Sequence, residues 1–349
     1  MVIPPENSGG TTQKRKQEHL AICLDSPVQF RQVTTGFEDY YFVHQALPEI
    51  DLQQVDLSVK LFDKTLAAPL VISAMVGGIA PAGKINRNLA AAARELGLAL
   101  SVGSERCLIE SPETAATFRV RDVAPDILLF ANLGAVQLNY GFGPAECLKA
   151  VEAIDADALV LHLNPLQEAL QTGGNTNFSG LLGRIKAVCR ELPVPVIVKE
   201  VGCGISTETA QALVEAGVDG IDVAGAGGTC WSEIEKLRTA AASSQRVAAA
   251  FDGWGIPTTE ALLMARKITP GLPVIASGGI RSGLDVAKAI ALGADAAGIA
   301  WPLLKPAATS ADAVVEYLAE IIHVLKITMF CTGSAGINNL KFSSRLHRH

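Results

Sequence analysis

Beginning at residue 69, short apolar runs alternate regularly with segments of helical periodicity. Eight of these runs are almost continuously apolar, so a strand built from any of them would be apolar on both faces. Such strands are typical of a parallel sheet that is covered on both sides. The eight runs are Pro69–Met75, Leu98–Gly103, Asp126–Ala131, Ala158–Leu163, Val194–Lys199, Gly220–Val223, Pro273–Ala276 and Ala296–Ala300.

Each run is followed by a segment whose apolar positions recur with the period of a helix. These segments are Ile85–Leu96, Pro112–Val120, Pro144–Ala153, Gly180–Glu191, Thr207–Ala216, Pro257–Ile268, Gly283–Leu292 and Asp312–Thr328. Eight strand–helix units with no break in composition predict an α/β fold, a (β/α)8 TIM barrel with an N-terminal extension. A doubly wound open sheet is the alternative topology.

The chain ahead of the barrel divides into two parts. Residues 1–13 are rich in Pro, Gly, Ser and Thr, which predicts a flexible tail. Residues 14–68 form the N-terminal extension, in which a basic segment leads into a short helical pattern, and one or two short strands are expected near Gln54–Phe62. The barrel is expected to span residues 69–341, with a second tail over residues 342–349.

Composition narrows the possible functions of this 349-residue chain. Apolar residues make up 49% and charged residues 18%, which allows a large core and excludes a mainly disordered protein. The net charge of −6 leaves no broad basic surface for nucleic acid, so no nucleic-acid partner is expected. An anionic ligand must therefore be held by a local basic cluster.

The cysteines and the hydropathy pattern bear on location. Seven cysteines, an odd number with no CxxC pair, argue against a zinc site or a disulfide framework and fit a reducing cytoplasm. The N-terminus lacks the apolar region of a secretory signal. No uncharged run is long enough to span a bilayer, so no membrane partner is expected.

Barrel enzymes carry their active sites at the C-terminal ends of the strands, so the residues that follow each run are the candidate site. Seven of the eight run ends carry a hydrogen-bonding or charged side chain or a pair of glycines; the last run, which ends in Ala300 and Trp301, is the exception. The charged and hydrogen-bonding candidates are Ser104, Arg106, Asn132, His162, Asn164, Gln167, Glu168, Lys199, Thr229 and Arg281. Their concentration at one rim favours a site over ordinary turns.

The seventh run leads through Gly278 and Gly279 into a helix that is expected to start near Ser282 or Gly283. Glycine permits a close backbone approach, and a helix N-terminus offers free N–H groups to an anion. The loops after strands 7 and 8 are the usual phosphate site of such barrels. This segment therefore predicts a phosphate site, to which Arg281 would add a charge.

Lys199 ends a buried strand, where an ammonium group without a partner is costly. Facing the carbonyl edge of a flavin, it would stabilise negative charge on the reduced ring. The alternative is a pairing with Glu200 or another acid at the rim.

Glu168 has no second carboxylate at ligand spacing. This excludes a metal cage built entirely from protein but suits Mg²⁺ held by one carboxylate, water and a substrate phosphate. A second anion has the basic groups Lys14, Arg15, Lys16, His19 and Arg106 available to it.

Several motifs together carry a family resemblance over about residues 14–341. They include RKQEHL at Arg15–Leu20, GSER at Gly103–Arg106, HLNPLQE at His162–Glu168, VKEVGCGIS at Val198–Ser206, DVAGAGGTCW at Asp222–Trp231 and SGGIRSGLDVAKAIALGA at Ser277–Ala294. On these motifs the chain resembles the type 2 isopentenyl-diphosphate Δ-isomerases, which use FMN. The last motif is also shared with FMN-dependent hydroxyacid oxidases.

The resemblance implies a role for each matching position. FMN would contact Ala74, Met75, Val76, Gly77, Ser104, Asn132, Lys199 and Thr229, with its phosphate on Gly279, Ile280, Arg281, Ala300 and Trp301. The substrate diphosphate would meet Arg15, Lys16, His19, Ser104, Arg106, His162 and Asn164. Gln167 and Lys199 would be the catalytic residues, Gln167 beside the reacting carbons, and Glu168 would hold Mg²⁺.

The implied reaction converts isopentenyl diphosphate into dimethylallyl diphosphate, with protons exchanged by reduced FMN and with NADPH or NADH needed only to reduce the flavin. A homo-oligomer, a tetramer or an octamer, is implied as well. The chain departs from the family, which usually has Thr at Val76, Gln at Glu105 and Ser at Cys230.

Three alternatives remain. An FMN-dependent 2-hydroxyacid oxidase would need a histidine base beside an arginine, and the sixth run ends in AGAGGTCW without one. A flavin-binding paralogue without catalysis would fit the departures at Val76 and Glu105. A dehydrogenase would use Cys230 as its nucleophile.

Overall fold

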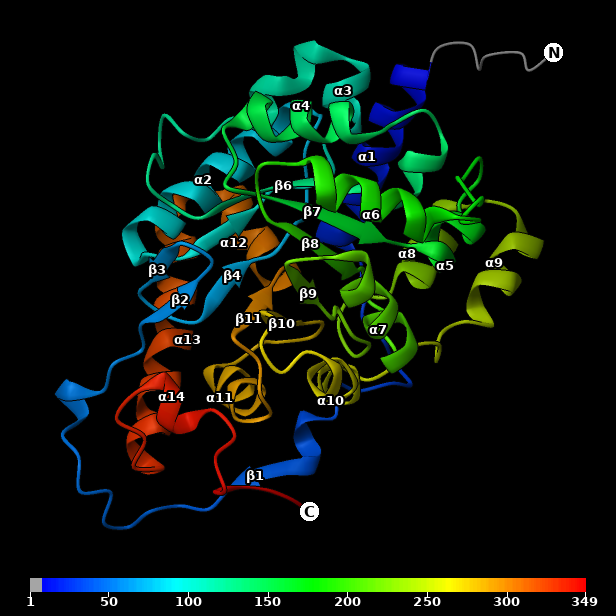
Figure 1. Cartoon of the computed structure of the whole chain (residues 1–349). Helices are drawn as coiled ribbons and strands as arrows, with labels where there is room; N and C mark the ends of the chain where they lie inside the picture. Colours follow the sequence, from blue (N-terminus) through cyan, green and yellow to red (C-terminus); the bar gives the residue numbers. More distant parts are fainter. Residues whose placement is uncertain (1–7) are drawn as a thin grey trace.

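The computed structural model describes residues 8–349 and contains a closed barrel of eight parallel strands in the order β10-β11-β4-β5-β6-β7-β8-β9. The strands are β4 (Leu70–Ile72), β5 (Ala99–Ser101), β6 (Leu129–Gly134), β7 (Ala158–Leu163), β8 (Val196–Glu200), β9 (Gly220–Asp222), β10 (Val274–Ser277) and β11 (Ala296–Ile299). Each overlaps one of the eight predicted apolar runs, with bounds that differ by up to a few residues. The TIM-barrel prediction is thus confirmed, and closure of the barrel excludes the open sheet (Figure 1).

Most of the predicted helices surround this barrel. They are α2 (Ala80–Leu96), α4 (Pro144–Ile154), α6 (Leu181–Glu191), α7 (Thr207–Ala216), α10 (Thr258–Ile268), α11 (Gly283–Ala291) and α13 (Ala311–Cys331). The helix predicted at Pro112–Val120 is wrong: that region holds α3 (Arg106–Glu110) and a 3-10 helix, η3 (Pro112–Thr117). Ser111 separates them in a non-helical conformation, because the following Pro112 disfavours helical geometry at the preceding residue.

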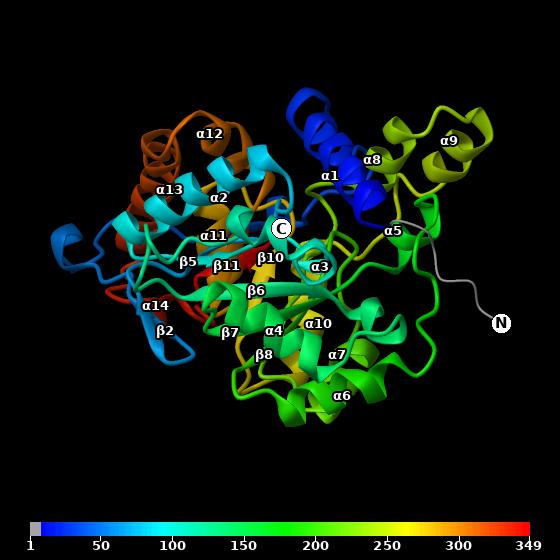
Figure 2. The same ribbon diagram turned by 90° about the horizontal axis from the view of Figure 1, so that it is seen from above.

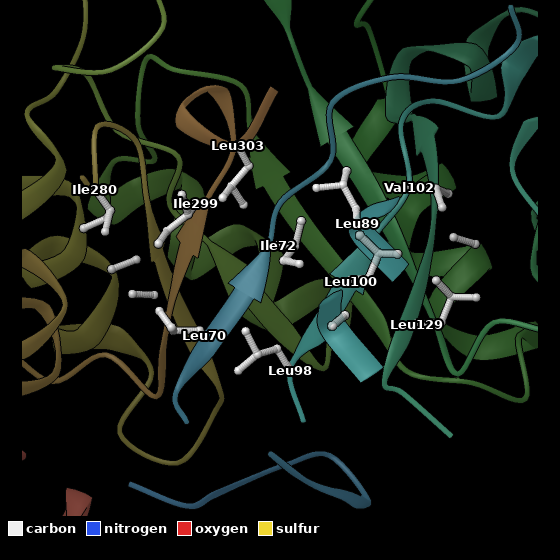
Figure 3. Close-up of a cluster of buried hydrophobic side chains, with 14 of the residues drawn as sticks. Leu70, Ile72, Leu89, Leu98, Leu100, Val102, Leu129, Ile280, Ile299 and Leu303 are labelled. Atoms are coloured by element: carbon white, nitrogen blue, oxygen red, sulfur yellow. The ribbon is translucent and has the colours of Figure 1, made fainter. Parts of the chain in front are cut away.

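The outward side chains of the strands pack against these helices. Leu70 and Ile72 of β4, Leu98 and Leu100 at β5, and Leu129 of β6 all belong to this outer core (Figure 3). All five are almost completely buried. This core holds the helices to the barrel and so fixes where the loops leave it.

Each strand directs two side chains inward, because alternate residues of a strand face the same side. We call the residues nearer the N-terminal ends of the strands the lower layer and those nearer the C-terminal ends the upper layer, although neighbouring strands are staggered. The lower positions are apolar or glycine: Val71, Ala99, Phe130, Val160, Ile197, Gly220, Ile275 and Ala296. The upper positions are almost all polar: Ser73, Ser101, Asn132, His162, Lys199, Asp222, Ser277 and Gly298. The hairpin of β2 (Val59–Leu61) and β3 (Lys64–Leu66) packs against the lower layer and closes the bottom of the barrel.

The N-terminal extension begins with α1 (Ser8–Asp25), which lies beside α8 (Trp231–Arg238), with α9 (Ala242–Ala249) next to them (Figure 2). Residues 8–13, predicted as part of a flexible tail, belong to this helix, and that part of the prediction is wrong. Residues 1–7 of the predicted tail lie outside the described residues. His19 of α1 contacts Glu235 of α8, with His19 Nε2 and Glu235 Oε1 2.8 Å apart. This contact with a distant helix stabilises α1, and the local composition of the segment does not reveal it.

The predicted C-terminal tail over residues 342–349 is also wrong. β12 (Leu346–Arg348) pairs antiparallel with β1 (Tyr40–Phe42), so backbone hydrogen bonds join the C-terminal end of the chain to the N-terminal extension (Figure 1). Such a pairing is set by tertiary structure, since its two strands are separated by the whole barrel. Among residues 8–349, no helix combines the length and the apolar character that crossing a membrane requires.

Candidate active site

A cavity opens at the C-terminal mouth of the barrel, with the polar inward layer at its floor and α1 at its side. Six of the eight upper-layer residues line it: Ser73, Asn132, His162, Lys199, Ser277 and Gly298. Of the basic groups suggested for a second anion, Lys14 is exposed and does not line this cavity. The structure brings the other sequence-predicted site residues to it: Arg15, Lys16, His19, Ala74, Met75, Val76, Gly77, Ser104, Arg106, Asn132, His162, Asn164, Gln167, Glu168, Lys199, Thr229, Gly279, Ile280, Arg281, Ala300 and Trp301. Their individual roles stay predictions.

The loops after β9 and β10 meet backbone to backbone on one side of the mouth. Gly279 has φ +79°, and a Cβ atom there would collide with Thr35 Cγ2. A Cβ on Gly228 would in turn collide with the Gly279 amide nitrogen. The glycines therefore form a cradle that no larger residue fits, in the place predicted for a phosphate.

The helix N-terminus contributes less to this cradle than the sequence suggested. Ser282 and Asp285 form a capping box, in which the Asp285 carboxylate accepts the amides of Arg281 and Ser282. An anion would therefore meet the Gly279 and Ile280 amides, which the described residues leave without a hydrogen bond. The Arg281 guanidinium is exposed and donates to Gln29 Oε1 at 2.5 Å.

Lys199 projects from β8 into the polar floor and is buried. Its Nζ donates to the Glu200 backbone carbonyl at 2.5 Å, and Asp222 is its cross-strand neighbour on β9. The Glu200 carboxylate instead accepts the amides of residues 201–203, while burial raises its pKa to about 7. The alternative that Lys199 is neutralised by the Glu200 carboxylate is thus not what the geometry shows.

A hydrogen-bonded chain runs from the floor into the wall of the cavity. His162 Nδ1 lies 2.8 Å from Asn132 Oδ1, and Glu105 Oε2 accepts the Asn132 amide at 2.8 Å. Burial, with the charges of Lys199 and Lys16, lowers the pKa of His162 to about 3, so its imidazole is neutral at physiological pH. Glu105 is fully buried behind the wall, where burial raises its pKa to about 8.

Two guanidinium groups face the other part of the cavity. Arg106 Nε is paired with Glu110 Oε1 at 2.7 Å, whereas Arg15 forms no ion pair with any residue between 12 and 349. Burial, and after it the neighbouring Arg106 charge, lower the pKa of Arg15. An anionic ligand would relieve this repulsion.

Two other basic residues of α1 are already engaged. Lys16 Nζ donates to the carbonyls of Gly77, at 3.0 Å, and Ser104, at 2.7 Å, which fastens α1 to the loops after β4 and β5. His19 is held by Glu235. These contacts place the helix at the cavity wall before any ligand arrives.

Glu168 lies on α5 (Pro165–Leu170), a short helix that Pro165 begins. Proline is well accommodated there, because the first turn of a helix does not need its missing N–H group. Glu168 Oε1 accepts Asn164 Nδ2 at 3.1 Å, and Asn164 Oδ1 is buried with no hydrogen-bond partner. Within residues 8–349 no cluster of three or more His, Cys, Asp or Glu side chains could hold a metal ion. One carboxylate beside an unpartnered amide oxygen is a donor set that fits a cation sharing its coordination with water and a ligand.

Several residues that line this cavity were not predicted from the sequence. Gln29, Gln137, Gln171 and Trp231 also line it. The three glutamines lie away from the run ends, so the strand pattern offered no signal for them, whereas Trp231 closes the AGAGGTCW segment after the sixth run and was overlooked there. Cys230, by contrast, does not line the cavity; its buried Sγ lies 3.0 Å from Ser232 Oγ, which argues against a nucleophilic role.

Known sequences resemble this chain over nearly its whole length. Proteins named isopentenyl-diphosphate delta-isomerase match it in Nostoc sp. (50% identity, covering 99% of both chains), in Synechococcus sp. (53% identity, 92% of both) and in Stutzerimonas stutzeri (51% identity, 94% of this chain and 95% of the relative). Residues 135–346 match the FMN-dependent dehydrogenase family.

Solved structures share the fold at much lower identity. A mandelate oxidase variant superposes with a TM-score of 0.67 at 20% identity, covering 98% of this chain and 99% of the other. A lactate oxidase from Pediococcus acidilactici gives 0.67 at 18% identity, covering 100% and 96%. This likeness is one of fold, and it makes the oxidase alternative a distant one.

Proposed function

The chain belongs to the isopentenyl-diphosphate delta-isomerases and carries the FMN-dependent dehydrogenase fold, and we propose that it converts isopentenyl diphosphate into dimethylallyl diphosphate. One observation carries this proposal. The glycine cradle lies at the ends of β9 and β10, whereas His162 is at the end of β7 and Glu168 follows it, three strands away from β10 around the closed barrel. One cavity therefore offers an anion site on each of two opposite sides of its mouth, with Lys199 at its floor.

The residues on the cradle side fit FMN. The Gly279 and Ile280 amides would hold its phosphate, and the Lys199 ammonium would stabilise negative charge on the reduced ring. The chemistry that reduced FMN would supply when bound is the addition and removal of protons at neighbouring substrate carbons. The reaction would be redox-neutral, with NADPH or NADH serving to reduce the flavin.

The residues on the opposite side fit a diphosphate and Mg²⁺. Arg15 and Arg106 would bind the diphosphate, with Lys16, His19, Ser104 and Asn164 around it. His162 would contribute a hydrogen bond rather than a charge, because its imidazole is neutral. Glu168 would hold Mg²⁺, and Gln167 would lie beside the reacting carbons. Binding energy from the charged end would thus orient the neutral alkene.

Two further properties belong to this proposal. None of the seven cysteines, all within the described residues, forms a disulfide, which supports a reducing compartment such as the cytoplasm. A homo-oligomer, tetrameric or octameric, is proposed from the family resemblance.

The test is an anaerobic assay of isopentenyl diphosphate with FMN, NADPH and Mg²⁺. Formation of many molecules of dimethylallyl diphosphate per NADPH consumed is the expected result. Stoichiometric NADPH consumption would favour an oxidoreductase instead. Bound FMN without any product would identify a flavin-binding paralogue.

A further inference from the structure

The loop that joins α5 to α6 contains a side chain that contacts the site from behind. Asn175 Oδ1 accepts hydrogen bonds from Arg106 Nη1 at 2.8 Å and from Gln137 Nε2 at 3.0 Å. Its backbone amide donates to Glu168 Oε2 at 2.5 Å. Arg106, Gln137 and Glu168 all line the cavity, whereas Asn175 does not.

These three contacts come from three neighbouring strand units. Arg106 follows β5, Gln137 follows β6, and Glu168 follows β7. The strands are adjacent in the barrel, but their loops leave it separately and have no common backbone. Asn175 is a single group through which the three cavity side chains are connected.

The loop itself is tightly placed. A Cβ atom on Gly174 would collide with the Glu168 carbonyl oxygen and would lie 3.0 Å from Glu168 Oε2. The Gly174 amide also donates to the Gln171 carbonyl at 3.0 Å. The backbone therefore approaches α5 as closely as glycine allows, which sets the position of the following Asn175.

We propose that Asn175 is a positioning residue that orients Arg106 and Glu168 toward the diphosphate and its divalent cation. This inference rests on the proposed function. The arginine already shares one edge with Glu110, and the hydrogen bond to Asn175 fixes a second nitrogen of the guanidinium. With two nitrogens held, the remaining donors of the planar group can point in one direction only.

The side-chain oxygen of Asn175 is the group that holds Arg106 and Gln137. Asn175→Asp keeps an oxygen within reach of both Arg106 and Gln137, whereas Asn175→Ala removes the acceptor and leaves the backbone contact to Glu168 intact. Asn177 provides a matched control in the same loop, because its exposed side chain accepts only the Ser179 amide among the described residues.

The experiment measures pyrophosphate binding, in the presence of Mg²⁺, to the FMN-loaded wild type and to N175A, N175D and N177A. Loss of the two hydrogen bonds is expected to weaken pyrophosphate binding by N175A about tenfold. N175D and N177A should bind as the wild type does. Steady-state kinetics of N175A should show a raised KM for isopentenyl diphosphate with kcat within about twofold.

FMN affinity separates positioning from general damage, because the glycine cradle lies across the barrel mouth from Asn175. It should be the same in all four proteins, and an equal loss of FMN affinity in N175A would overturn the positioning role. Equal pyrophosphate affinity of N175A and the wild type would overturn it too, as would N175D binding as weakly as N175A. A wild type that binds no pyrophosphate would instead contradict the proposed function, and the inference with it.

Discussion

Replacing Glu105 with glutamine should stabilise the folded chain by an amount that grows as the pH rises. The Glu105 carboxyl is fully buried, with Oε2 accepting the Asn132 amide and Oε1 lacking any partner among the described residues. Burial raises its pKa from the ordinary 4.5 to about 8. Glutamine has nearly the same shape and can still accept the Asn132 amide, but it cannot ionise.

The direction and the size of this change in the free energy of unfolding follow from the linkage between proton binding and folding. Between pH 4.5 and about 8 the folded chain keeps a proton on Glu105 that the unfolded chain releases, so raising the pH favours unfolding. The stability that the protonated carboxyl contributes is complete below pH 4.5 and is lost as the pH rises to about 8. Each pH unit costs about 1.4 kcal/mol, and the loss reaches about 5 kcal/mol at pH 8. That is a large share of a typical domain stability of about 5–15 kcal/mol.

Urea unfolding of the wild type and of E105Q, measured at each pH unit from 5 to 9, tests this. The difference in the free energy of unfolding should rise by about 1.4 kcal/mol per pH unit up to pH 8 and then become constant. Glu113, an exposed acid on η3, supplies the control, since E113Q should show no such rise. If the free energies of unfolding of the wild type and of E105Q changed with pH in the same way, the reasoning would be refuted.

Three further substitutions test the proposed site. Lys199→Ala should weaken the binding of reduced FMN relative to oxidised FMN in anaerobic titrations, and an unaltered ratio would count against its electrostatic role. Glu168→Gln should abolish either the activity or its Mg²⁺ requirement, so a normal rate with normal Mg²⁺ dependence would contradict the assignment. Gly279→Ala should abolish FMN retention, because its new methyl group meets Thr35 at a positive φ, whereas Gly271→Ala points into open space and should retain FMN normally.

The sequence alone determined the barrel and the residues at its mouth. Eight runs that are apolar on both faces have few stable arrangements other than a parallel sheet covered by helices, so the strands followed from local composition. The strand ends then shared one face of the barrel, which brought residues as distant as Ser104, Glu168 and Gly279 to one cavity. Periodicity and strand direction are local properties, and both are readable without knowing any contact.

Tertiary structure decided what depends on contacts between distant segments. The pairing of β12 with β1 needs the folded barrel to bring residues 40–42 and 346–348 together. The protonation of Glu105 depends on its burial beside Asn132 of β6, and the contacts of Asn175 depend on three segments that meet in space. Burial and hydrogen-bond partners are properties of the packed chain. The sequence around a polar side chain does not show which distant groups will contact it after folding.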